Sequence, residues 1–505
     1  MNGAAGNYHL RTSYDRHDMG GRLSDPGAQP DPFKVYPGLD RIVLPQDISG
    51  PEEALSAVLD DGRRADPDAE LDLHRLARIL SLTHALTGQA RYGSEVFYFR
   101  NVPSAGALYP FELYVAVRRV AGLEDGLYHH SVRDQSLIAL RSGGGRREIA
   151  KTLQSHGDSG PVLAFFLTSI FFRSSWKYRD RAYRYHLLDT GHLVENLSMA
   201  LKSARLSFQV QYDFDDETVN DYLGVDPKRE GCLAVVLVSG AALQPASGSS
   251  TRSDAMKDLA ESSKVSSREI EYLPIREIHK ASCKIFAGHL DIDMLSALGG
   301  AVQESVPVPR PEKWPQAMNY RDAVMKRRSM RNFAPHELPA DHLESLLGAL
   351  CCGAEAKADS QPAGVDAAAV GLLTGRVAGL APGFYLLDRK RRGLGRVVEN
   401  HSLTAEMAHA CLDQGWLINC ALHFLFLCNL ELLEKTWGPR GYRYAMLTAG
   451  RLGQRLYVAA TSMGLGCCGI GAFYDREAAS LLSINEYASL LYLVAVGPVH
   501  QRSTP

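Results

Sequence analysis

One stretch of this chain occurs twice, and the repeat restricts the possible folds more than any other feature of the sequence. Residues 182–216 and 441–475 align without a gap, at a constant offset of 259 residues. The identities include Tyr183, Arg184, Tyr185, Gly191, Ser203, Leu206, Phe214 and Asp216, which match Tyr442, Arg443, Tyr444, Gly450, Ser462, Leu465, Phe473 and Asp475. A repeat at about half the chain length indicates that a whole domain was duplicated, because solenoid repeats have periods of only ~20–50 residues.

The composition fits two globular domains. The 505 residues are 45% apolar and 22% charged, which suits two domains of roughly 200 residues each. The net charge of −2 gives no electrostatic reason to expect nucleic acid or a membrane as a partner. The nine cysteines show no C-x-x-C spacing and the N-terminus has no signal-peptide pattern, so we expect reduced thiols in a cytoplasmic protein. The longest apolar run, residues 416–428, is too short to span a bilayer.

Each copy mixes helices with a few separated strands. Residues 71–82 and 337–350 have helical periodicity, and residues 320–326 begin another helix. Strands are expected at residues 112–120, 161–172, 232–239, 416–428 and 490–496. This pattern predicts an α+β fold. We expect an extended N-terminal arm at 1–50, a first domain at 51–240, a linker at 241–314 and a second domain at 315–505.

The two copies differ in their glycines. The second copy has Gly464, Gly466, Gly469 and Gly471 where the first copy has larger residues. Such a loop lets the backbone approach a flat ring and aim N–H groups at it. The alternative is a helix C-cap at Gly464, which accounts for one of the four glycines.

A cluster of arginines follows the helix expected at 320–326. Arg327, Arg328 and Arg331 lie close together in sequence, and Ser329 adds a hydroxyl. Planar guanidinium groups bind a phosphate with two parallel hydrogen bonds. The alternative is a solvated basic helix end that the helix dipole favours.

Lys177 and Tyr178 occur only in the first copy, because the second copy has Thr436 and Trp437 at these positions. A lysine whose pKa is lowered by desolvation can remove a proton at neutral pH. The alternative is a surface lysine beside a packing tyrosine. No second ligand stands at metal spacing from His192, so no metal is expected.

Four segments together resemble the flavin-dependent nitroreductase superfamily, and its oxidase branch, the SagB/ThcOx-type dehydrogenases, fits best. They are residues 327–331 (RRSMR), 103–110 (PSAGALYP), 177–185 and 464–473. The resemblance covers roughly residues 70–240 and 315–500. It implies two nitroreductase-like domains, each a small, mostly antiparallel sheet wrapped by helices, which form an intramolecular pseudo-dimer with FMN at the interface.

The resemblance also implies roles for individual residues. Arg327, Arg328, Ser329 and Arg331 would hold the FMN phosphate. The flavin ring would contact Pro103, Ser104, Ala105, Gly106 and Leu108 from the first domain and Gly469, Ile470, Gly471 and Ala472 from the second, with an amide near Gly471 facing flavin N5. Lys177 and Tyr178 would assist proton removal. Cys467 and Cys468 are expected as small fillers against the ring.

Complementary halves of this site survive in opposite copies. We call residues 103–110 the PSAG turn and residues 327–331 the arginine segment. In place of the PSAG turn, the second copy has only Gln361, Pro362, Ala363 and Gly364. In place of the arginine segment, the first copy has Asp60, Asp61, Gly62, Arg63 and Arg64. We therefore expect one composite FMN site per chain and one site without function.

Three functions remain open from the sequence. The first is an FMN-dependent oxidase or dehydrogenase that takes hydride from a small or peptide-derived substrate, such as an azoline. The second is an NAD(P)H-dependent reductase of nitro or quinone compounds, and the third is a non-catalytic flavin-binding partner subunit. A further homodimer is possible in each case.

Overall fold

A computed structural model of the chain describes residues 3–19, 24–47, 49–50, 52–60, 62–66, 70–93, 95–142, 162–239, 259–286, 288, 290, 292–311, 313–354 and 366–500. The chain divides into two compact units. The first-repeat unit comprises residues 23–51 and 62–285, and the second-repeat unit comprises residues 1–22, 52–61 and 286–505. The stretches expected as an arm and as a linker each contribute residues to both units, and the first 50 residues contain helix α1 (Ala4–Arg11) and strand β1 (Arg41–Val43).

The first-repeat unit is built on a seven-stranded sheet in the order β1-β6-β5-β4-β7-β9-β8. Every neighbouring pair is antiparallel. The further strands are β4 (Phe111–Val117), β5 (Gly126–Ser131), β6 (Ser136–Ser142), β7 (Leu163–Ile170), β8 (Ser207–Gln211) and β9 (Glu230–Ser239), and a separate hairpin joins β2 (Leu86–Tyr92) to β3 (Glu95–Arg100). All residues of β4 and β7 are buried, which explains their almost continuous apolar sequence.

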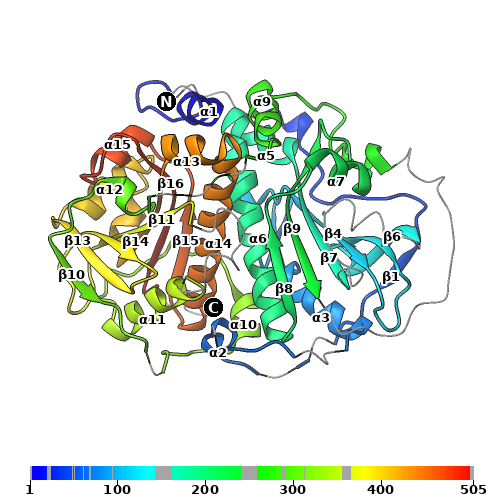
Figure 1. Cartoon of the computed structure of the whole chain (residues 1–505), viewed down its shortest axis with the longest axis horizontal. Helices are drawn as coiled ribbons and strands as arrows, with labels where there is room; N and C mark the ends of the chain where they lie inside the picture. Colours follow the sequence, from blue (N-terminus) through cyan, green and yellow to red (C-terminus); the bar gives the residue numbers. More distant parts are fainter. Residues whose placement is uncertain are drawn as a thin grey trace. The chain divides into compact units, whose positions relative to one another are not determined.

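Helices cover this sheet (Figure 1). They are α3 (Leu73–Thr83), α5 (Phe171–Tyr178), α6 (Ala182–Ser203), α7 (Asp216–Leu223) and α9 (Leu273–Ser282), with 3-10 turns η1 (Pro26–Ala28), η2 (Ala105–Ala107), η3 (Arg179–Arg181) and η4 (Ala260–Ser263). Within α6 every residue except Lys202 is buried. A helix enclosed in this way lies in the core of its unit, so its polar side chains must find partners inside the protein.

The second-repeat unit repeats this topology, with a sheet in the order β10-β13-β12-β11-β14-β16-β15. Its neighbouring strands are also all antiparallel. The strands are β10 (Glu304–Pro307), β11 (Ala369–Thr374), β12 (Gly383–Asp388), β13 (Gly393–Glu399), β14 (Leu422–Asn429), β15 (Gly466–Ile470) and β16 (Ala488–Gly497). The helices besides α1 are α2 (Leu55–Leu59), α10 (Tyr320–Lys326), α11 (Ala340–Cys351), α12 (Leu403–Ala410), α13 (Leu430–Trp437), α14 (Arg440–Ser462) and α15 (Asp475–Ser480), with 3-10 turns η5 (Ser296–Leu298) and η7 (Gly415–Asn419).

The matching strand orders confirm the predicted duplication and the α+β class. Helices α5 and α13, and strands β8 and β15, have the same bounds once the offset of 259 residues is applied. The backbone agrees even where the residue types differ. Arg179 and Gly438 both have positive φ, at 50° and 58°, and so do Arg205 and Gly464, at 53° and 75°. The fold therefore requires a left-handed residue at these points whether or not glycine is present.

Two expected strands differ in extent from those observed. Residues 416–428 were expected as one strand, but Gly415–Asn419 form the 3-10 turn η7 and the strand runs over Leu422–Asn429. Residues 161–172 were also expected as one strand, yet the chain turns into α5 at Phe171. An apolar run does not distinguish a buried strand from the buried start of a helix. Asp61 and residues 361–364, on which part of the comparison between the copies rests, lie outside the described residues.

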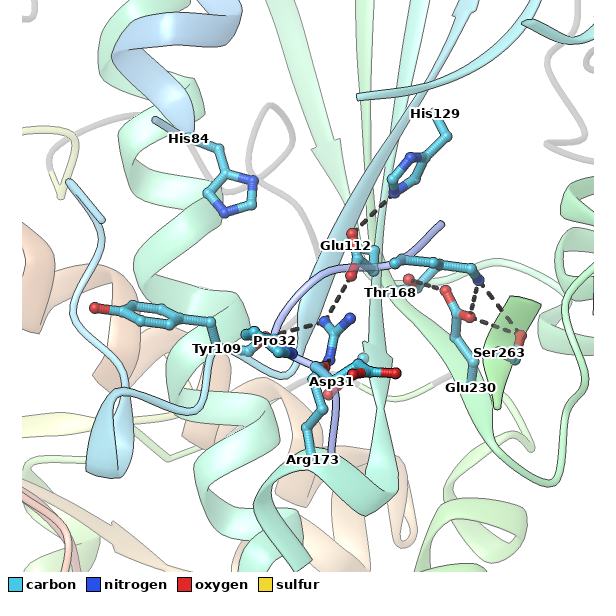
Figure 2. A network of polar contacts seen from close by, with 12 residues as sticks. Asp31, Pro32, His84, Tyr109, Glu112, His129, Thr168, Arg173, Glu230 and Ser263 are labelled. Atoms are coloured by element: carbon cyan, nitrogen blue, oxygen red, sulfur yellow. Dashed lines mark hydrogen bonds and ion pairs between the residues drawn. The ribbon is translucent and has the colours of Figure 1, made fainter. Parts of the chain in front are cut away.

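The core of the first-repeat unit contains a network of buried charges (Figure 2). Glu112 on β4 accepts hydrogen bonds from Arg173, at 2.6 Å, and from His129, at 2.8 Å. Lys34 is fully buried and contacts Glu230, which also accepts from the hydroxyl groups of Thr168 and Ser263. Burial favours the neutral carboxyl, but Arg173 and His129 outweigh it and lower the pKa of Glu112.

The second repeat has small apolar residues at the corresponding positions. By sheet register Ala369 takes the place of Glu112, and Ala488 takes the place of Glu230. The charged core is therefore a feature of the first repeat and not of the shared fold. None of the helices in the described part of the chain is long and apolar enough to cross a membrane.

Candidate functional site

The PSAG turn of the first-repeat unit has a strained backbone. Gly106, Ala107 and Tyr109 all have positive φ, at 64°, 55° and 47°. A non-glycine residue in this region costs roughly 1–2 kcal/mol, and such residues concentrate at functional sites. Ser104 stabilises the turn, because its Oγ accepts a hydrogen bond from the Tyr109 amide at 2.9 Å. Pro103 is buried and Leu108 is half-buried.

Asp189, in the middle of α6, holds the start of this turn. It accepts a hydrogen bond from Ser104 Oγ at 2.5 Å and a longer one from the Ala105 amide at 3.4 Å. Burial raises the pKa of Asp189 to about 7, although the two hydrogen bonds oppose the shift. The sequence reasoning missed this residue. The repeat carried a signal, because the corresponding residue of the second copy is Thr448.

Lys177 and Tyr178 lie against the same turn. A Cβ atom added at Gly106 would approach Tyr178 Oη to 2.7 Å and Lys177 Nζ to 3.4 Å, so only glycine fits there without displacing them. Tyr178 packs at the end of α5 with its ring centroid 4.6 Å from that of Tyr185. Lys177 itself is exposed. The first-repeat unit thus brings Gly106 together with Lys177 and Tyr178, which follow it 71 and 72 positions later in the sequence.

Arg173 connects Tyr109, which follows Gly106 in the same turn, to the charged core (Figure 2). It lies on α5, one turn before Lys177, and its Nη1 donates to the Tyr109 carbonyl at 3.2 Å as well as to Glu112. The Arg100 amide donates to Tyr109 Oη at 3.2 Å. The buried charges therefore fix the end of the turn and the helix that carries Lys177 in one frame.

In the second-repeat unit the arginine segment and the glycine-rich segment are in direct contact. The Met330 amide donates to the Cys467 carbonyl at 2.9 Å. Tyr457, on α14, links the same two segments, because its Oη accepts from the Gly469 amide at 2.6 Å and shares a hydrogen bond with Ser329 Oγ at 2.9 Å. The sequence reasoning missed Tyr457, which is Ser198 in the first copy.

The three arginines have different surroundings. Arg327 is 3% exposed, with its guanidinium 5.4 Å from the ring centre of Tyr457. Arg328 donates to the Arg327 carbonyl at 2.7 Å and so covers the C-terminal end of α10. Arg331 is exposed, 5.9 Å from the ring centre of Trp416. Arg327 and Arg331 flank Ser329 in the sequence, and their guanidinium groups are of the kind that binds an anionic group.

The glycine-rich segment is a strand and not a loop. Gly464 has the left-handed conformation that follows a helix, whereas Gly466 and Gly469 belong to strand β15. A Cβ at Gly469 would meet Tyr492 Oη at 1.7 Å, and one at Gly466 would meet Val499 Cγ1 at 2.2 Å. Packing against β16 and the chain that follows it therefore requires these two glycines. Gly471 and Ala472 follow the strand and are half-buried, while Ile470 is buried.

The two cysteines of β15 are not reactive thiolates. Both are buried, and neither forms a disulfide. The other seven cysteines also form no disulfide, and of these Cys283 and Cys352 are half-buried while the rest are buried. Burial raises the pKa of Cys468 to about 11, against the opposing effect of Arg331 and Arg327, and raises the pKa of Cys467 as well. A protonated, buried thiol behaves as a small apolar side chain.

The residues present fit a flat, phosphorylated ligand. The second-repeat unit offers Arg327, Arg331 and the Ser329 hydroxyl, which are suitable donors for a phosphate. The first-repeat unit offers the exposed Gly106, at which the backbone can approach a flat ring closely. Each set of donors is held in place by contacts within its own unit.

The duplicated sheet topology defines a tandem-domain α+β protein. The chain belongs to the nitroreductase family, whose sequence pattern matches residues 53–240 and 324–498. Proteins of this family are generally oxidoreductases that bind a flavin such as FMN.

Three known proteins are similar to this chain. The crystal structure of a predicted nitroreductase from Anabaena variabilis ATCC 29413 matches 99% of this chain and 100% of its own, with a TM-score of 0.78 and 26% identity. Protein MJ1384 of Methanocaldococcus jannaschii, also a predicted nitroreductase, is 29% identical over 173 residues, which are 34% of this chain and 87% of the relative. The trifolitoxin-processing protein TfxB of Rhizobium leguminosarum bv. trifolii is 32% identical over 183 residues, which are 34% of this chain. The match spans only about half of TfxB, at 47% of its length.

Proposed function

We propose that this protein is an FMN-dependent oxidoreductase that oxidises a small or peptide-derived substrate, in the manner of a SagB/ThcOx-type dehydrogenase. Bound FMN would supply the electron chemistry by accepting a hydride at N5. Arg327, Ser329 and Arg331 would bind its phosphate, and the PSAG turn together with residues 469–472 would contact its ring. The complementary sequences of the two repeats favour one FMN per chain.

The observation that carries this proposal is the contact of Lys177 and Tyr178 with Gly106 of the PSAG turn. Loss of hydride from a C–H bond next to a heteroatom, as in an azoline ring, requires that a proton leave elsewhere on the substrate. A base beside the residues that would contact the flavin ring can take that proton. The likeness to a trifolitoxin-processing protein supports a peptide-derived substrate.

A second candidate is an NAD(P)H-dependent reductase of nitro or quinone compounds. The likeness over the whole chain to a predicted nitroreductase favours it. The two functions differ in the direction of electron flow. Anaerobic addition of NAD(P)H would bleach the flavin of a reductase within a turnover time and leave that of a substrate oxidase unchanged. A non-catalytic flavin-binding partner would show neither reduction nor oxidation of substrate.

The first test is the flavin content of the purified chain. We expect the visible spectrum of the flavin released from the protein to show one FMN per chain. The double variant Arg327→Ala/Arg331→Ala should bind FMN at least about tenfold more weakly, because each lost arginine–phosphate contact is worth about 1.5–3 kcal/mol. Arg321→Ala is the matched control, since Arg321 is an exposed residue of the neighbouring helix α10. Two FMN per chain, or unchanged binding in the double variant, would contradict the proposed site.

The second test separates proton removal from charge. Lys177→Ala and Lys177→Arg should both keep FMN, and both should lose the rate of flavin reduction by substrate, by about 10²–10⁴-fold. Arginine keeps the positive charge but cannot act as a base at neutral pH. Stopped-flow measurement of flavin bleaching by an azoline-containing peptide provides the readout. If Lys177→Arg retained the wild-type rate, Lys177 would have an electrostatic role and proton removal would fall to another residue.

A further inference from the structure

A group of metal-ligating side chains lies in the first-repeat unit, apart from the residues of the proposed flavin site. We propose that Asp216, His279 and Cys283 form a binding site for a zinc ion. The ligand atoms of these three residues lie within 4.8 Å of one another. The three ligand groups are a carboxylate, an imidazole and a thiol.

The local structure explains why the three residues meet. His279 is in the last turn of α9, and Cys283 is the C-cap residue of the same helix, four positions later. Side chains four positions apart lie on one face of a helix. Asp216 is the first residue of α7 and is 3% exposed, while His279 is 7% exposed. Cys283 is half-buried, which leaves the site open on one side.

The surroundings of His279 orient it as a metal ligand. Its Nδ1 is 3.2 Å from Tyr183 Oη, and Tyr183 Oη is 3.2 Å from Ser282 Oγ. A histidine ligand commonly uses one ring nitrogen for the metal and the other for such an outer hydrogen bond. Nε2 lies close to Gly231, where a Cβ atom would approach it to 2.7 Å, so a larger residue at position 231 would displace the ring.

The set of ligands suits zinc. Zinc accepts sulfur, nitrogen and oxygen ligands at about 2.0–2.3 Å, which places neighbouring ligands roughly 3.3–3.8 Å apart in a tetrahedron. Ligand atoms that lie up to 4.8 Å apart must therefore approach one another on binding, and a rotation of the half-buried Cys283 side chain can contribute to this approach. The thiolate and the carboxylate together neutralise the two charges of the ion. The same three residues line a cavity of about 900 Å³ from which a water molecule can fill the fourth position.

The second-repeat unit contains the same arrangement without the cysteine. His9 Nδ1 is 3.2 Å from Tyr442 Oη, and His9 Nε2 is 3.9 Å from Asp475. Tyr442 and Asp475 are the repeat counterparts of Tyr183 and Asp216. Four positions after His9 the chain has Ser13, whose Oγ donates to the His9 carbonyl at 2.8 Å. Cys283 Sγ makes the equivalent contact with the His279 carbonyl at 3.3 Å.

This comparison separates the shared structure from the metal site. The Tyr–His–Asp arrangement occurs in both units, so it needs no metal to form. Among the described residues, a thiol accompanies this arrangement only in the first-repeat unit. The second-repeat unit already has serine at the position equivalent to Cys283, and we therefore expect the Cys283→Ser variant to fold.

The experiment is a titration of the full-length chain, produced without a histidine tag and stripped with a chelator, with Co²⁺ as a spectroscopic substitute for zinc. Difference spectra against the metal-free protein remove any flavin absorption. We expect a thiolate-to-cobalt charge-transfer band that saturates at one Co²⁺ per chain and disappears on addition of Zn²⁺. Cys283→Ser should abolish the band and weaken Co²⁺ binding at least tenfold, since loss of even an outer partner costs about 10–100-fold.

Two further variants make the result decisive. Cys352→Ser removes another half-buried thiol, in the second-repeat unit, and should leave the band unchanged. Asp216→Asn keeps the shape of the side chain but removes its charge, and it should weaken binding while the thermal unfolding midpoint stays close to that of Cys283→Ser. Absence of the band in the wild-type chain, or its persistence in Cys283→Ser, would overturn the proposal. Both readouts are independent of oxidoreductase activity, so failure here leaves the proposed function intact.

Discussion

Asp189 is a buried carboxyl group that titrates close to neutral pH. It is buried at 4% exposure, and burial raises its pKa to about 7. Its hydrogen bond with Ser104 connects that titration to the PSAG turn. A carboxyl group that titrates near neutral pH at this position would change the contacts of the turn in the range where enzymes usually work.

The pKa of Asp189 predicts how stability depends on pH. Between about pH 4 and pH 7 the native carboxyl keeps its proton while the unfolded one ionises, so the native state binds more protons and loses stability as pH rises. Asp189→Asn cannot ionise but still accepts a hydrogen bond. We expect its free energy of unfolding relative to wild type to increase over this range by at most about 4 kcal/mol.

Thermal unfolding of both proteins at pH 4.5 and pH 7.5 measures this difference. Asp221→Asn is the control, because Asp221 is exposed on α7 of the same unit. A difference between Asp189→Asn and wild type that stays constant with pH would mean that the carboxyl is ionised throughout.

The two long helices α6 and α14 are each followed by a residue with a left-handed backbone, so the fold requires this conformation at both positions whichever residue type is present. Helices α6 and α14 each end in a turn with one residue of positive φ, which is Arg205 in the first repeat and Gly464 in the second. Glycine adopts this conformation without a steric penalty, whereas arginine does not. The first repeat accepts the penalty because strand β8 must still pair with β9.

Opposite substitutions at this turn should have opposite effects. Arg205 is exposed, so Arg205→Gly should raise the free energy of unfolding by about 0.5–1 kcal/mol by relieving the backbone. Gly464→Ala should lower it by about 1 kcal/mol, although the nearest atom to the new Cβ, at 3.6 Å on Ala317, leaves enough space. Urea denaturation of the two variants beside wild type tests both. Destabilisation by Arg205→Gly would mean that the arginine side chain makes a contact worth more than the backbone penalty.

Sequence reasoning found the elements but not all of the contacts between them. The constant offset of 259 residues was enough to predict two copies of one α+β domain, and the PSAG turn and Lys177 are in contact within one unit. Asp189 and Tyr457 were missed because each is one of several polar residues in a buried helix, and its importance depends on a partner from a distant segment. Residues 466–470 were expected as a loop because glycine disfavours strands, yet pairing with β16 overrides that local preference.

Across the molecule, the two repeats have the same sheet but different cores. The first-repeat unit buries Lys34, Glu112, Arg173 and Glu230, whereas Ala369 and Ala488 occupy the carboxylate positions in the second. Buried ion pairs rarely add stability compared with apolar residues of similar size. Their connection to Tyr109 and α5 suggests a different benefit, which is a rigid frame for the PSAG turn and Lys177.

Loss of one partner from this network should be costly. We expect Glu112→Gln to lower the free energy of unfolding by about 3–5 kcal/mol, because Arg173 is left with an uncompensated charge in the core. Glu124→Gln, an exposed change in the same unit, should stay within about 0.5 kcal/mol of wild type. Urea denaturation measures both. An effect of Glu112→Gln below about 1 kcal/mol would show that water or another group replaces the lost carboxylate.

The membership of helix α1 in the second-repeat unit has a consequence for synthesis. The residues of the first-repeat unit have all been made once residue 285 has been added. His9, in contrast, is translated before any residue of that unit, yet its partner Tyr442 lies 433 residues later. During translation helix α1 must wait on the growing chain while the first-repeat unit folds, and it can reach its binding surface only after Tyr442 has been added. The two units of this duplicated protein therefore mature in a fixed order, in which the second is completed by a segment that was synthesised before the first.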